Sequence, residues 1–168
     1  MPERRQASGS EDTSLSSAVI EVEDSFEAAN ELAYQRGWTD GLPIVPPTEE
    51  RVHRMLEHLG RRGTEVVARV GPRKGVATLE KIATNAVMAG CLPEYLPVVV
   101  AAVEAIAEPE FNIDGVQSTT SPTAPLVVAS GPTVAMLGIN AGRNALGHGC
   151  RANASIGRAL RLVLINIG

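Results

Sequence analysis

Residues 78–108 read TLEKIATNAVMAGCLPEYLPVVVAAVEAIAE, and this stretch decides the fold class. Thr78 is a favoured residue at the start of a helix, and Gly90 lies where a glycine commonly ends one. The first half therefore predicts a helix over residues 79–89. Because Pro93 is tolerated in a first turn, a second helix is predicted over residues 94–108. Both halves are rich in alanine and valine, so we expect the two helices to be buried.

Three further helices are predicted on either side of this pair from capping residues and apolar periodicity. The first covers residues 25–36, with Asp24 and Glu27 at its start and Gly37 at its end. The second covers residues 49–59, with Thr48 at its start and Gly60 at its end. The third covers residues 154–166, with Asn153 or Ser155 as its cap. Strands are predicted over residues 65–70, 111–119 and 126–130. The pattern indicates a mixed α+β fold, a single domain of about five helices with a small sheet.

The first 22 residues are rich in Ser, Glu and Arg and hold few apolar residues, which predicts a disordered tail. The single domain should then occupy residues 23–168. Residues 38–47, WTDGLPIVPP, contain three prolines and the only tryptophan, so they should be extended rather than helical. Such a stiff segment either lines a cleft or straps across the domain.

Composition narrows the class of protein. The chain has 168 residues with a formal net charge of −4, which does not favour a nucleic-acid binder. Its longest apolar run, residues 96–107, is interrupted by Pro97 and Glu104 and is too short to cross a membrane. The polar residues 1–17 lack the apolar core of a secretory signal. Two widely spaced cysteines do not make a disulfide framework. We therefore expect a cytoplasmic protein.

A glycine-rich polar run at residues 138–157 predicts the functional site. Five glycines punctuate it, and it leads directly into the apolar residues 156–167. Glycine allows a close approach to the backbone, and the free N–H groups at the start of a helix face an anionic or polar ligand. The run thus indicates a binding loop for a small molecule.

Four residues are candidates for catalysis. His148 is an acid/base candidate, and Cys150, two residues on, is a thiol candidate; the alternatives are an ordinary loop histidine and a structural cysteine. Cys91 lies between two predicted helices, as either a reactive thiol or a small buried hydrophobe. Asp114 precedes a glycine, and it either forms a turn or orients His148.

Six further residues are candidates for substrate binding. Arginine can hold a carboxylate in a bidentate way, and asparagine can donate and accept hydrogen bonds or simply form turns. Thr119 belongs to a hydroxyl-rich segment that either binds a ligand or makes local turns. The candidates are Asn140, Arg143, Asn144, Arg151, Asn153 and Thr119. No metal-ligand spacing or nucleotide-binding motif is present, so neither a metal site nor a particular cofactor is predicted.

Four segments together resemble a known family. They are GWTDGLPIVPPTEERVHRML at 37–56, ATNAVMAGCLPEYLPVVVAAVEAI at 83–106, NIDGVQSTTSPTAPLVVASGP at 112–132 and GHGCRANASIGRALRLVLIN at 147–166. This wording resembles a bacterial family that accompanies the UGSC-type (seleno)proteins, whose relatives are reductase-like. The resemblance implies a related fold, a second protein subunit as partner, and a C-terminal extension that this chain lacks.

The leading hypothesis is a small subunit of a hetero-oligomeric cytoplasmic enzyme that acts on a small organic molecule. Hydrolysis is the favoured reaction, with His148 as acid/base and the arginines and asparagines as anion binders. The second hypothesis is a redox component in which Cys91 or Cys150 exchanges electrons with a thiol or selenol partner. The third is a non-catalytic scaffold or binding subunit.

Overall fold

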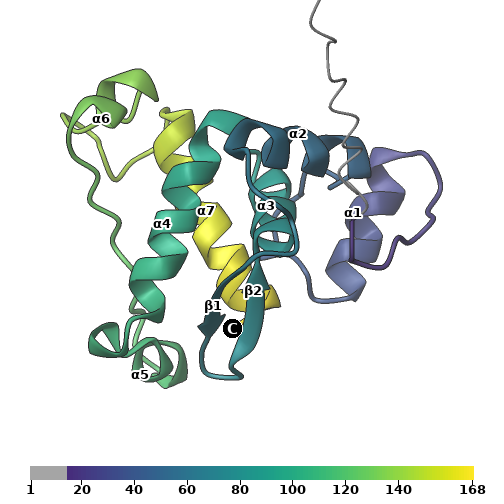
Figure 1. The fold of residues 1–168 in the computed structure, drawn as a ribbon, viewed down its shortest axis with the longest axis horizontal. Coiled ribbons are helices and arrows are strands. Elements are labelled where there is room, and N and C mark those ends of the chain that lie inside the picture. The colour runs from purple at the N-terminus through teal and green to yellow at the C-terminus, as the bar shows by residue number, and fades with distance from the viewer. Residues whose placement is uncertain (1–14) are drawn as a thin grey trace, which may run out of the picture.

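Helix α3 (Leu79–Met88) lies at the centre of the fold in the computed structural model, which describes residues 15–168 (Figure 1). It packs against α2 (Glu49–Leu59), α4 (Leu96–Ala107) and α7 (Arg151–Asn166). Four side chains of α3 are fully buried in the core, Leu79, Ile82, Ala83 and Ala86, and Val87 and Met88 are nearly so. The expected burial of this alanine-rich helix and of the valine-rich α4 is confirmed.

The sheet consists of one antiparallel hairpin, β1 (Val66–Val70) and β2 (Gly75–Thr78), with an irregular register between Val66 and Ala68. The sequence predicted β1 but missed β2, because four residues directly before a helix cap carry little strand signal. Gly75 lies against the end of α7: a Cβ atom there would fall 1.9 Å from the carbonyl oxygen of Ile167. The hairpin and the last turn of α7 therefore meet without an intervening side chain.

Helix caps account for most of the predicted boundaries. Thr48 and Thr78 cap α2 and α3 as expected. Helix α1 (Phe26–Gln35) is capped by Ser25, whose hydroxyl accepts from the Ala28 N–H at 3.1 Å, so the expected cap at Asp24 is wrong by one residue. Two 3-10 turns, Pro93–Tyr95 and Pro109–Phe111, flank α4.

Two predicted strands are wrong. Residues 113–118 form the short helix α5 (Ile113–Ser118), because Asn112 adopts a left-handed conformation and accepts from the Gly115 N–H. Residues 126–130 form neither helix nor strand and pair with no strand among the described residues. They belong to a long excursion over residues 119–149, here called the arm, which contains only the short helix α6 (Pro132–Met136). Figure 1 shows the arm projecting to one side of the helical body.

Residues 15–168 thus form a mixed α+β domain of seven α-helices and one two-stranded sheet. The expected number of about five helices is exceeded because α5 and α6 are single short turns that have no apolar periodicity. Of the expected disordered tail, residues 1–14 lie outside the described residues, and residues 15–22 form no helix or strand. None of the helices in the described part of the chain is long and apolar enough to cross a membrane.

Candidate functional site

The glycine-rich run leads into α7 as expected, but the helix starts earlier than predicted. It begins at Arg151 with Cys150 as its N-cap residue, so the expected start at Ala154 and caps at Asn153 or Ser155 are wrong. Local signals favoured asparagine and serine as caps. In the folded chain the asparagine side chains of this run are engaged elsewhere.

The three asparagines hold the run together. The Asn153 side chain accepts from the Asn140 N–H at 2.9 Å and donates to the carbonyl oxygens of Asn140 and Ala145, both at 2.9 Å. Asn140 in turn bonds the Arg143 carbonyl at 3.0 Å, and Asn144 bonds the His148 carbonyl at 2.9 Å. These amides satisfy backbone groups of the loop, which supports the turn-forming role.

Cys150 lies where the loop meets the helix. Its Sγ is 2.9 Å from Asn153 Oδ1 and 3.3 Å from the Gly138 carbonyl oxygen. The nearby backbone N–H of Asn153, and then those of Asn140 and Ala152, outweigh burial and hold the pKa of the half-exposed thiol below its usual range. Backbone N–H groups at a helix start favour the thiolate in this way.

The charged candidates beside Cys150 are spread over the loop. His148 and Arg143 are exposed, and no described residue hydrogen-bonds their side chains. The Arg151 guanidinium donates to the Gly90 carbonyl oxygen at 3.2 Å, which ties the start of α7 to the turn after α3. The loop therefore offers one thiol and two free polar side chains to the solvent.

Asp114 and Thr119 lie elsewhere. Asp114 is in α5 and forms a 2.6 Å ion pair with Lys74 in the β1–β2 turn, near the end of α7. Helix α7 has 16 residues and so spans about 24 Å, which keeps Asp114 away from His148 at its start. Thr119 lines a 400 Å³ hollow against the middle of α7, together with Gln117, Ser121 and Arg161. The structure does not gather the predicted residues into one site.

Cys91 behaves differently from Cys150. It is buried between α3 and α4, and burial raises the pKa of its thiol to about 11, against a smaller opposing effect of a hydrogen bond with Ser155. This supports the structural alternative for Cys91. No group of three or more His, Cys, Asp or Glu in residues 15–168 could hold a metal ion.

We expect the two cysteines to differ sharply in alkylation by iodoacetamide. Cys150 should react with a midpoint pH below that of a free thiol, because its thiolate is favoured. Cys91 should stay unmodified at pH 7.5, because it is buried and protonated. Peptide mass spectrometry over pH 5–10 measures both rates in one sample, and a faster reaction at Cys91 would contradict the assignment.

A separate cavity of about 800 Å³ lies on the other side of the fold, between α1, α2 and α3. The segment 38–47 forms one wall, residues 15–22 cross the opening, and the end of α7 closes one side. Most of the lining is apolar. Trp38, Ile44, Pro46 and Pro47 all face this cavity, so the stiff segment lines a cleft, one of its two expected roles.

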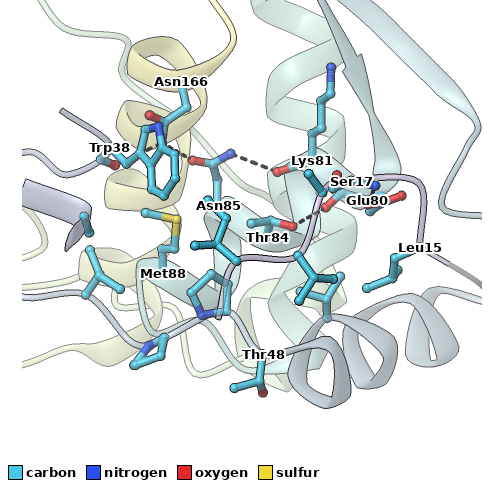
Figure 2. Close-up of a pocket in the computed structure, with 18 of the residues that line it drawn as sticks. Leu15, Ser17, Trp38, Thr48, Glu80, Lys81, Thr84, Asn85, Met88 and Asn166 are labelled. Carbon is cyan, nitrogen blue, oxygen red and sulfur yellow. Dashed lines mark hydrogen bonds between the residues drawn. The ribbon is translucent and has the colours of Figure 1, made fainter. Parts of the chain in front are cut away.

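Polar side chains gather at one end of the cavity (Figure 2). The buried Asn85 accepts from Asn166 Nδ2 at 2.7 Å and donates to the Lys81 carbonyl oxygen at 2.9 Å. Asn166 Nδ2 also donates to the Trp38 carbonyl oxygen at 3.0 Å. The two neutral amides are therefore held in fixed positions beside the indole.

The opposite end of the cavity is fixed by a buried carboxylate. Glu80 is 1% exposed, and it accepts from the Ser16 N–H at 2.8 Å, the Ser16 hydroxyl at 2.7 Å and the Ser17 N–H at 2.7 Å. These bonds attach residues 15–22, here called the N-terminal strap, to α3. Burial raises the pKa of Glu80, but the hydrogen bonds from Ser17 and Ser16 outweigh burial, and the pKa lies below its ordinary value.

The segment beside the cavity is also fixed to α7. Arg158 makes a bidentate contact with Asp40, with Nη2–Oδ1 at 2.8 Å and Nε–Oδ2 at 3.0 Å. The hydrogen bond from Arg158 lowers the pKa of Asp40.

Sequence reasoning missed Glu80 and Asn85 as site residues. Their positions in the sequence could have indicated them, because both are polar residues inside a helix that is otherwise predicted to be buried.

No protein-family model matches the chain, and neither a curated protein nor a solved structure matches it. The resemblance in four segments therefore stays an expectation, and the features that bear on function are the cavity and the glycine-rich loop.

Proposed function

We propose that this chain binds a small, largely apolar organic molecule in the cavity between α1, α2 and α3, as the small subunit of a hetero-oligomeric cytoplasmic enzyme. The observation that carries the proposal is the cavity. Its volume of about 800 Å³ lies within the range of roughly 300–1,000 Å³ that is typical of small-molecule sites. An apolar lining with a few fixed polar groups is also typical of such sites.

The polar end of the cavity indicates the ligand chemistry. Asn85 and Asn166 are uncharged, so they suit a neutral donor or acceptor such as a carbonyl, amide or hydroxyl group. Trp38 offers an aromatic face beside them, and the apolar walls suit a hydrocarbon or aromatic body. Glu80 is occupied by the strap, which leaves it poorly placed to bind a cationic ligand.

The cavity and the glycine-rich loop are at different ends of α7. Asn166 and Ile167 reach the cavity from the end of the helix, whereas His148 and Cys150 precede its start. His148 and Cys150 are therefore not placed to act on a molecule in the cavity, and the proposed enzyme takes its catalytic groups for that molecule from the cavity lining or from the partner chain. Hydrolysis, with His148 as acid/base, stays a prediction for a substrate that reaches the loop.

A cavity-filling substitution tests the binding role. Ala29→Phe, on the cavity face of α1, should weaken binding at least tenfold by occupying the apolar space. Ala28→Phe is the matched control, because Ala28 is the neighbouring residue and does not line the cavity. Binding of neutral esters, amides and alcohols can be followed through Trp38, the only tryptophan in the chain.

Two results would contradict the binding role. One is the absence of any saturable change in Trp38 fluorescence across the series of neutral compounds. The other is equal binding by the Ala29→Phe and Ala28→Phe variants. The subunit role is tested separately by native mass spectrometry of the protein purified from its own host. A complex with a second, different chain is expected. A species that contains only copies of this chain would contradict the subunit role.

Thiol exchange at Cys150 is a second candidate, favoured by its lowered pKa and partial exposure. In this reaction the Cys150 thiolate attacks a partner disulfide, a mixed disulfide forms, and the partner's second sulfur leaves as a thiolate. A Cys150→Ser variant that supports full turnover in the native complex would remove this candidate.

A further inference from the structure

The N-terminal strap crosses the mouth of the cavity between α3 and the start of α1 (Figure 2). At one end the chain continues into α1, which Ser25 caps. At the other end Glu80 accepts from the Ser16 N–H, the Ser16 hydroxyl and the Ser17 N–H. Within residues 15–168, the hydrogen bonds that fasten the strap to other elements all end on this carboxylate. A single side chain therefore anchors the strap.

The apolar side chains of the strap cover the cavity without being buried. Val19, Ile20 and Val22 line it, yet they are 65%, 46% and 46% exposed. Burial of apolar surface is the main force that holds a segment to a folded domain. A segment that buries little surface and has few hydrogen bonds opens locally, without unfolding the rest of the protein. The strap meets both conditions.

The strap closes over the cavity but does not fill it. A volume of about 800 Å³ remains beneath the strap and the other walls. An internal competitor of the ligand would instead occupy that space with its own side chains. A cover over such a space slows both the entry and the exit of a ligand, and it adds apolar contacts once the ligand is inside. The geometry is that of a lid.

We propose that the N-terminal strap is a lid, which opens by breaking its contacts with Glu80 and hinges at the start of α1. This inference rests on the binding role proposed above, because it assigns a gate to that same cavity. A molecule enters while the strap is open. When Ser16 and Ser17 return to Glu80, the apolar side chains of the strap cover the molecule and exclude water from it.

Access to the cavity can be measured without a ligand. Ala33 lines the cavity and is 4% exposed, so Ala33→Cys in a Cys150→Ser background places a thiol behind the lid. Its reaction with N-ethylmaleimide is followed by peptide mass spectrometry. Adding Ser16→Ala and Ser17→Pro removes two of the three donors to Glu80 and should accelerate the reaction at least tenfold.

Glu21→Pro is the matched control. It places a proline in the same strap, but the Glu21 N–H bonds no described residue, so the rate at Ala33→Cys should not change. Glu80→Ala removes the anchor from the α3 side and should accelerate the reaction as the serine variant does. The buried Cys91 reports global unfolding in the same samples, because it reacts only when the core opens.

Two results of the labelling experiment would overturn the lid. One is an unchanged rate at Ala33→Cys in an anchor variant that keeps Cys91 protected. The other is reaction of Cys91 in both anchor variants, which would show that the strap is part of the folded core.

Ligand kinetics give the second test. For a compound that changes Trp38 fluorescence, the serine variant should raise the association and dissociation rates at least tenfold in stopped-flow measurements, without tightening binding. Tighter binding would identify the strap as a competitor and overturn the lid. If no compound binds, the binding role fails on its own, because the labelling experiment decides on the lid without a ligand.

Discussion

Glu80→Ala should detach the N-terminal strap and open the cavity. Hydrogen exchange at residues 16–22 is expected to accelerate at least tenfold, while exchange in α3 and α7 changes little. The substitution removes three hydrogen bonds to a buried carboxylate, and bonds to charged groups contribute about 1.5–3 kcal/mol each. Hydrogen-exchange mass spectrometry of the peptide that covers the strap measures the effect.

The control and the pH dependence sharpen this test. Glu57→Ala removes an exposed glutamate from α2 and should leave the strap protected. Because the pKa of Glu80 is lowered in the folded state, its contribution is complete above the ordinary glutamate pKa of about 4.3. The contribution is lost as pH falls through the lower, folded pKa. A strap that is equally protected in Glu80→Ala and wild type would show that the carboxylate does not hold it.

Gly75→Ala should destabilise the protein by about 2 kcal/mol, the middle of the range for a side chain forced into packed structure. Its new Cβ would lie 1.9 Å from the Ile167 carbonyl oxygen and 3.2 Å from the Ile167 side chain. A backbone atom cannot move aside as a flexible side chain can. The end of α7 must therefore shift away from the hairpin, which also moves Asn166 at the edge of the cavity.

Gly157→Ala provides the opposite case. Gly157 lies inside α7, and a Cβ atom there would meet nothing within 4 Å. Alanine in place of glycine in a helix interior should stabilise the protein by about 0.5–1 kcal/mol. Urea unfolding of both variants measures the two free energies. If the two variants changed the free energy of unfolding in the same direction, either the predicted close contact at Gly75 or the predicted gain in helix propensity at Gly157 would be wrong.

The sequence predicted those helix boundaries that depend on contacts between residues close together in the chain. Thr48 and Thr78 each satisfy an N–H group three residues ahead, so both helix starts could be read from the sequence. The strand expected over residues 111–119 failed because Asn112 starts a helix instead. The strand expected over residues 126–130 has the composition of a strand but lacks a partner in the described chain. A strand forms only where a second segment pairs with it, and the composition of one segment does not show whether such a partner is present.

The candidate site was only partly predictable for the same reason. The sequence predicts the glycine-rich run before a long helix, which the structure confirms, and one of its two predictions for the segment beginning at Trp38, a cleft wall, is also confirmed. The cavity itself depends on contacts between distant residues. Glu80 bonds a serine 64 positions earlier, and Asn85 bonds an asparagine 81 positions later. No spacing rule connects such residues before the chain folds.

These two contacts of α3 bear on how the protein is made. Glu80 binds the strap and Asn85 binds the end of α7, so both walls that close the cavity are attached to one helix. During synthesis α3 leaves the ribosome long before α7, and its apolar face has no α7 to cover it until the arm has also emerged. The nascent chain therefore exposes the face of α3 that its last helix covers, and the cavity closes late in folding.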